Sequence, residues 1–235
     1  MTSDLRAPAT FHYIAFYDLL ADAAFQHRCA TAESDSFRMN RYARASVIAA
    51  ALSVECAANC LIHSLELSAT LRTELDKLSP LAKVETYLQL SEFGALDRGR
   101  VEVQRMKELI TARNEYVHPK VAAIGAVVEE PKDAGHEWHV PFSIDGEHWS
   151  GLQIPKKAMF WSNANSQTTL RAIAEFFRYL FVELMKSTSE QLHGILPSRI
   201  QIGDVHMLAV FEEFKREIAG ASEFGADFSY LGLTE

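Results

Sequence analysis

Apolar residues recur at helical spacing through most of the chain, and this pattern predicts a predominantly α-helical protein. The clearest case is the segment 37–67, whose middle is apolar almost all round and rich in alanine. A helix that is apolar on nearly every side is typical of the centre of a bundle. Alanines would also let neighbouring helices approach it closely. We therefore expect this segment to be the central helix of the fold.

The same spacing predicts further helices on both sides of the central segment. We expect them over 9–30, 68–78, 81–90, 98–117, 166–185 and 204–218. Side chains that commonly cap helix N-termini stand at the start of four of them, namely Thr10, Ser68, Ser166 and Asp204. Pro119 disfavours α geometry at His118, so the helix at 98–117 should end there.

The pattern changes over residues 121–161. The stretch 121–128 is β-prone, bulky and polar residues alternate over 137–142, and Asp145-Gly146 is a hairpin-turn signal before 148–154. We expect an exposed β-hairpin or three-stranded flap inserted into one domain that spans 1–235. The predicted fold class is therefore an all-α bundle with a small inserted β-flap.

Composition narrows the setting. The hydrophobic share of 48% and charged share of 23% are ordinary for a globular protein. The net charge of −8 argues against a broad surface that coats nucleic acid, but allows a small site of local positive charge. We see no apolar run of the ~20 residues that a membrane span needs, and no secretory signal pattern. We expect a cytoplasmic protein with no membrane contact.

The three cysteines, Cys29, Cys56 and Cys60, are an odd number in alanine-rich surroundings, which favours reduced thiols in a core. Cys56 and Cys60 lie four apart and could supply two metal ligands. Two ligands do not make a tetrahedral site, and no nearby histidine pair completes one. We expect buried structural cysteines, no metal and no cofactor.

The stretch 109–119, LITARNEYVHP, combines residues suited to RNA cleavage without a metal. Such cleavage needs a base for the 2′-hydroxyl, an acid for the departing 5′-oxygen, and positive charge on the phosphorane. His118 can transfer protons near neutral pH, and the planar fork of Arg113 matches phosphate oxygens. Asn114 lies four residues before His118, on the same helix face, and could orient it. Arg113 lies about 140° away around an ideal helix.

These residues resemble the motif of the HEPN superfamily, the all-α domains of many prokaryotic ribonuclease toxins and defence proteins. That family carries an Arg and a His a few residues apart late in a bundle helix, often with Asn after the Arg. The segment 53–59, SVECAAN, is similar to the family's long central helix, with a polar or acidic residue among alanines. The resemblance covers 9–118 and 166–185. It implies a composite site in a homodimer, because one chain has only one such His and Arg.

The leading hypothesis is a metal-independent endoribonuclease, a toxin or phage-defence effector that acts on RNA and pairs with a cognate antitoxin. Arg113 would stabilise phosphate charge, His118 would carry protons and Asn114 would orient His118. Three alternatives stay open. The motif is also typical of a well-capped helix end, where Arg and charged His suit the helix dipole. The chain could be a non-catalytic HEPN-like module that binds a partner protein or nucleotide, or a structural helical adaptor.

Two further sets of residues are candidates. Glu55 and Asn59 lie four apart inside an apolar helix, where an unpaired carboxylate is costly, so they should bond a neighbouring helix end or support the motif. Phosphate could also be bound by a stripe in which arginine recurs every three residues. Alternatively, the stripe is a solvated helix face that pairs with Glu33 and Asp35. The arginines are Arg38, Arg41 and Arg44.

Histidines and tryptophans gather in the expected flap, namely His136, Trp138, His139, His148 and Trp149. Aromatic side chains in a flap can stack on bases. An ordinary hairpin with one face packed on the bundle is the favoured interpretation.

Overall fold

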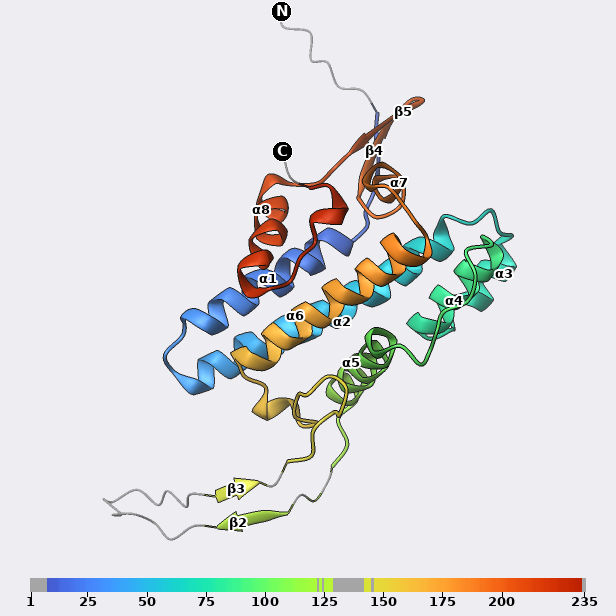
Figure 1. The fold of residues 1–235 in the computed structure, drawn as a ribbon. Coiled ribbons are helices and arrows are strands. Elements are labelled where there is room, and N and C mark those ends of the chain that lie inside the picture. Colours follow the sequence, from blue (N-terminus) through green and yellow to red (C-terminus); the bar gives the residue numbers. More distant parts are fainter. Residues whose placement is uncertain (1–7, 122, 124, 129–141, 145, 234–235) are drawn as a thin grey trace, which may run out of the picture.

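A computed structural model describes residues 8–233 except 122, 124, 129–141 and 145. Within these residues the fold is mainly helical, and the helix α2, Ser36–His63, runs through its middle (Figure 1). Helices α1, α4, α5 and α6 pack around α2. The prediction of one central helix is confirmed, although α2 ends four residues before the expected boundary at 67.

The helices around α2 mostly follow the apolar pattern. Helix α5 ends at Val117, directly before His118, as the following proline predicts. Helix α6 continues into a π-helical segment, η2, that ends where the sequence predicts. The bounds are α1 Phe16–Ala32, α3 Ala69–Leu75, α4 Pro80–Leu90, α5 Val101–Val117, α6 Asn163–Phe177, η2 Arg178–Leu184, α7 Ser189–His193 and α8 Glu212–Gly220. Short 3-10 turns are η1 Ala158–Phe160, η3 Ala221–Phe224 and η4 Ser229–Leu231.

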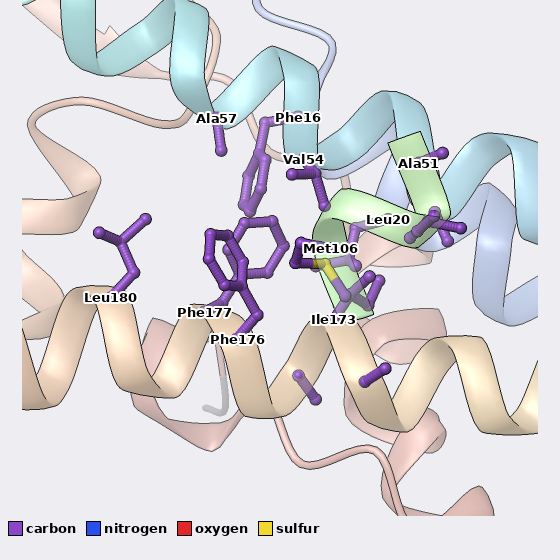
Figure 2. Packing of buried hydrophobic residues seen from close by; sticks show 14 of the residues in the cluster. Phe16, Leu20, Ala51, Val54, Ala57, Met106, Ile173, Phe176, Phe177 and Leu180 are labelled. Atoms are coloured by element: carbon purple, nitrogen blue, oxygen red, sulfur yellow. The ribbon is translucent and has the colours of Figure 1, made fainter. Parts of the chain in front are cut away.

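Aromatic rings fill the space between α1, α2 and α6. Figure 2 shows Phe16 of α1 meeting Phe176 and Phe177 of α6 beneath Val54 and Ala57 of α2. The Phe16 and Phe177 rings meet edge to face, with centroids 5.4 Å apart. The alanines of α2 leave room for these rings, because a longer side chain at such a position would occupy their volume. The centre of the core therefore depends on small residues in α2 and large ones in its neighbours.

Ser68 caps α3, as predicted, since its side chain accepts the N–H of Leu71. Ser166 does not cap α6, and this prediction was wrong. The cap is Ser162, four residues earlier, and Ser166 is fully buried inside the helix. There its hydroxyl donates to the carbonyl of Asn163 and bonds His27 Nδ1 at 2.8 Å. Ser166 therefore serves a contact between α1 and α6 instead of a helix end.

A three-stranded antiparallel sheet replaces parts of two expected helices. Its order is β1 (Thr10–His12), β4 (Arg199–Ile202) and β5 (Val205–Leu208). The helix expected over 9–30 begins only at α1, and Thr10, expected as a cap, pairs with Gln201 in the sheet.

The helix expected over 204–218 begins only at α8. Asp204, expected as its N-cap, lies in the turn between β4 and β5. Gly203 precedes it with φ of +57°, a backbone conformation that suits a two-residue hairpin turn. The β-branched residues Ile200, Ile202 and Val205 around this turn alternate with polar ones, which favours strands over a helix. The all-α prediction is therefore correct only as a mainly helical fold.

The segment 121–161 contains a β element, as predicted. Strand β2, Ala126–Val128, pairs antiparallel with β3, Phe142–Ile144. The pairing differs from the expected one, because β3 pairs with the upstream segment instead of with 148–154. Asp145 of the expected turn lies outside the described residues, as do His136, Trp138 and His139.

The second half of this segment does not form an exposed flap. Leu152, Ile154 and Trp161 are fully buried, and the Trp161 indole donates to the carbonyl of Pro155 at 2.7 Å. Two backbone N–H groups, from Gly151 and Leu152, donate to Glu108 of α5. Residues 146–161 therefore cover the bundle beside α5, an outcome that the alternating pattern did not predict.

One helix within the described residues meets the length and composition of a membrane span. It is α2, with a mean hydropathy of 1.8 over its most apolar window, of which 67% is buried inside the fold. The central helix of a bundle meets the same criteria, and the packing around α2 accounts for its apolar surface.

We predict that His27 makes the protein sensitive to mild acid. Burial lowers the pKa of His27 from 6.5 to about 4. Between these two pH values the unfolded chain binds a proton at His27 and the folded chain does not. Stability from this group is complete above pH 6.5 and falls by up to roughly 3 kcal/mol as the pH drops towards 4. Urea unfolding of His27→Gln should show a flatter pH profile over this window than the wild type. Equal slopes for the wild type and His27→Gln would contradict the assignment.

Candidate functional site

Arg113 of the motif faces inward and forms an ion pair with Glu55 of α2. Its Nη2 donates to Glu55 Oε2, and the two side chains are 15% and 35% exposed. Arg113 lies three residues after Ile110 and seven after Met106, both buried, which turns it toward α2. Desolvation lowers the pKa of Arg113 from its ordinary value, although a guanidinium stays charged at neutral pH. The structure thus brings together two of the residues singled out in the sequence.

His118 and Asn114 lie at the exposed C-terminal end of α5. His118 is the C-cap residue, with φ of −117° and ψ of 65°, and its backbone N–H donates to the carbonyl of Asn114 at 2.9 Å. Within the described residues, no hydrogen bond joins the two side chains. Arg113 therefore meets α2 while His118 points to solvent at the helix end, in keeping with the angle between them on an ideal helix.

Asn59 connects α2 to α4 and does not contact the motif. Its Oδ1 accepts a hydrogen bond of 2.7 Å from Lys83 Nζ. Lys83 is only 5% exposed, and Asp76 lies 4.0 Å from the same ammonium. The two polar residues inside the central helix thus have cross-helix partners on different sides, Glu55 toward α5 and Asn59 toward α4.

The three arginines at the start of α2 have different surroundings. Arg38 is exposed, and its backbone N–H donates a hydrogen bond to the carboxylate of Asp35, the N-cap residue of α2. The guanidinium of Arg41 lies 5.8 Å from the centre of the Phe37 ring. Within the described part of the chain, none of the three forms an ion pair, and Glu33 bonds backbone N–H groups instead.

Arg41 and Arg44 border a groove of 430 Å³ between α1, α2 and α5. Its floor includes Ile48 and Leu52, and Tyr116 of α5 closes one side. Leu52 lies one helical turn before Glu55, so the groove adjoins the Arg113–Glu55 pair along α2. Arg38 does not line this groove.

A larger cleft, of 1210 Å³, opens on the other side of Glu55. It lies between the C-terminal half of α2, helices α3 and α4, and the sheet. Both Glu55 and Asn59 line it, whereas Arg113 and His118 do not. The sheet contributes four polar residues to its wall, His12, Arg199, Gln201 and His206.

The sequence interpretation missed these four residues because it placed β1 and β5 in helices and left β4 without a predicted element. The signal that identifies them is the Gly203-Asp204 turn between alternating polar and β-branched residues. In the antiparallel register, His12 pairs with Arg199 and Gln201 pairs with His206. These pairs lie on one face of the sheet because side chains alternate between faces.

The cysteines are free thiols. Cys56 and Cys60 hydrogen-bond each other along α2, which lowers the pKa of Cys56 and, together with burial, raises that of Cys60. Among the described residues, no group of three or more His, Cys, Asp or Glu side chains is placed to hold a metal ion.

We predict a measurable coupling between Arg113 and Glu55. Glu55→Gln leaves a guanidinium that is mostly buried without its counter-charge, which should cost about 1–3 kcal/mol of stability. Arg113→Met should recover part of this cost in the Glu55→Gln background. Denaturant unfolding of the two single variants and the double variant gives the coupling energy. The matched control is the more exposed pair Arg98–Glu85, whose coupling should stay below about 1 kcal/mol. Equal coupling in both cycles would contradict a special role for the Arg113–Glu55 contact.

Comparison with known proteins finds no matching family model, no matching curated protein and no matching solved structure.

Proposed function

We propose that this protein is a metal-independent endoribonuclease of the HEPN type, active as a homodimer in the cytoplasm. The observation that carries the proposal is the ion pair between Arg113 and Glu55. It connects the motif helix to the acidic residue of the central helix, the two segments on which the resemblance rests. The planar guanidinium of Arg113 has a fork of donors that matches the oxygens of a phosphate.

The groove between α1, α2 and α5 supports the dimer. Its lining combines the apolar side chains of Ile48 and Leu52 with two arginines and one carboxylate, namely Arg41, Arg44 and Asp22. A two-fold axis through such a surface places each arginine opposite the partner's carboxylate, and closed two-fold pairing is the commonest symmetry. The same packing brings the C-terminal ends of two α5 helices, each with an exposed His118, toward one another.

In this dimer the two histidines divide the proton transfers. One His118 takes the proton of the 2′-hydroxyl, whose oxygen attacks the phosphorus. The other protonates the departing 5′-oxygen, so the products are a 2′,3′-cyclic phosphate and a 5′-hydroxyl. Arg113 neutralises the phosphorane by exchanging its contact with Glu55 for the phosphate oxygens. Asn114 orients the His118 ring. As a toxin or defence effector, the enzyme would be held inactive by an antitoxin that covers the composite site of the dimer.

Two observations favour a second function. Glu55 already neutralises Arg113, and the chain as a whole carries a net charge of −8. Both features suit a non-catalytic HEPN-like module that binds a protein partner or nucleotide.

We predict RNA cleavage in excess EDTA, with 2′,3′-cyclic phosphate ends, on a panel of structured and unstructured RNAs that includes tRNA. His118→Ala should abolish cleavage because it removes the proton-transfer group. Arg113→Lys should lower the rate by roughly a hundredfold or more, since an ammonium cannot reproduce the bidentate contact. Asn114→Ala should be milder. Gel assays measure the rates, and thermal melting checks folding.

The matched control is Arg105→Lys, on the same helix and paired with Glu175 outside the motif, which should keep full activity. A wild type that cuts and binds no RNA would support the non-catalytic module instead. Cleavage that appears only with added divalent metal would contradict the roles given to His118 and Arg113.

We predict that Leu52→Glu converts the dimer to a monomer, because it places a carboxylate in the apolar floor of the groove. Light scattering at micromolar concentration measures the mass. The control Leu90→Glu changes a residue of α4 that is 55% exposed and lies outside the groove, and it should stay dimeric. A wild type that is monomeric at this concentration would remove the composite site.

A further inference from the structure

The cleft of 1210 Å³ beside the sheet holds a buried ammonium group with few acceptors. Lys83 is 5% exposed, and its Nζ donates to Asn59 Oδ1 at 2.7 Å. Its nearest carboxylate, on Asp76, is 4.0 Å away, beyond hydrogen-bond length. An ammonium has three donors, and a buried charge needs both a counter-charge and hydrogen bonds. The cleft therefore presents a cation whose requirements the described residues meet only in part.

Two arginines in the same cleft are held in place with donors to spare. Arg72 Nη2 donates to the carbonyl of Leu65 at 3.3 Å, and Arg199 Nη2 donates to the carbonyl of Gly194. The Nε of each is buried and has no acceptor among the described residues. Arg72 stands on α3 and Arg199 on β4, so two different elements contribute arginines to the cleft.

The charge of the lining is opposite to that of the chain. The cleft holds three Lys and Arg side chains against two carboxylates, Glu55 and Asp76. Glu55 is already paired with Arg113, which lies outside the cleft, and the side chain of Asp76 is 62% exposed. A local excess of cations in a chain of net charge −8 favours an anionic ligand.

From these contacts we propose that the cleft binds a phosphate-bearing ligand, with Lys83, Arg72 and Arg199 as its phosphate contacts. Phosphate oxygens supply the acceptors that these three side chains lack, and Arg and Lys are the residues that most often bind them. Carboxylate ligands would use fewer of the donors, because they offer two oxygens instead of three or more.

The cleft is larger than a single phosphate requires, which indicates a ligand with a further group. At its mouth Tyr13 is 63% exposed, and its hydroxyl donates to Asp18 at 2.7 Å, which holds the ring in place. An exposed, fixed aromatic ring is a platform on which a nucleobase can stack. The phosphate can therefore come from a nucleoside phosphate or from a single RNA strand. This site is independent of the proposed nuclease chemistry, since neither Arg113 nor His118 lines it.

Calorimetric titration of the full chain tests the site with three probes: pyrophosphate, ADP and a short 2′-O-methyl oligouridylate. The last probe carries the RNA backbone but lacks the 2′-hydroxyl, so binding is measured without cleavage. We expect at least one probe to bind, and Arg199→Gln and Lys83→Met to weaken it roughly tenfold or more through loss of charge-assisted hydrogen bonds. Tighter binding of the oligonucleotide than of ADP identifies RNA as the source of the phosphate, and the reverse order identifies a nucleotide.

Two controls make the outcome specific. Arg216→Gln removes a cation of α8 that is 75% exposed and outside the cleft, and it should bind as the wild type does. Arg105→Gln, on α5 and outside the cleft, should also keep full binding. The titration follows binding alone, so a failed nuclease proposal does not affect it. If Lys83→Met does not unfold cooperatively, Arg199→Gln and Arg72→Gln are compared with the wild type in its place. Binding that none of the cleft variants weakens, or no binding of any probe at millimolar concentration, would overturn the proposal.

Discussion

The burial of α2 is the constraint on which the rest of the molecule depends. A helix that is apolar on most sides is stable in water only when other helices cover it, and α1, α4, α5 and α6 do so. Its alanines admit Phe16, Phe176 and Phe177 at close range. Burial also restricts what a polar residue in α2 can do, because a carboxylate or amide there must find a partner on a neighbouring helix.

Glu55 and Asn59, in the C-terminal half of α2, find their partners on different neighbouring helices. Glu55 pairs with Arg113, which fixes the motif helix α5 against the core. Asn59 accepts from Lys83, which keeps a buried cation at the wall of the large cleft. The contact of α2 with the motif helix α5 and its contact with Lys83 thus lie one helical turn apart.

Most of the helical framework could be predicted from the sequence, because a period of 3.6 in apolar residues reports which face is buried. The end of α5 before Pro119 and the Ser68 cap followed from local rules that tertiary packing did not override. The three-stranded sheet was missed for a physical reason. β1 and β4 meet only in the fold, since Phe11 pairs with Ile200 far along the chain, and short strands carry little periodic signal of their own.

The contacts of the candidate site, too, could be predicted from the sequence only in part. The meeting of Glu55 and Arg113 could be anticipated in kind, because a buried carboxylate needs a partner, but its identity depends on how α5 packs on α2. The contact of Ser166 with His27 could not be predicted from the sequence. A serine at the start of an apolar run has the pattern of an N-cap whether it lies before the helix or inside it. His12, Arg199 and His206 could be assigned to one surface only once the strand register was known.

In the dimer that we propose, two copies of this chain bring their α5 ends together. The most direct measurement is the distance between spin labels attached at position 118 in a His118→Cys variant that lacks the native cysteines, recorded by double electron–electron resonance. Packed helices lie about 8–10 Å apart, so labels on two helix ends that meet should lie within roughly 20 Å of each other. A single short distance is the result we predict. A dimer whose labels lie much farther apart, or no intermolecular distance at all, would contradict the composite site.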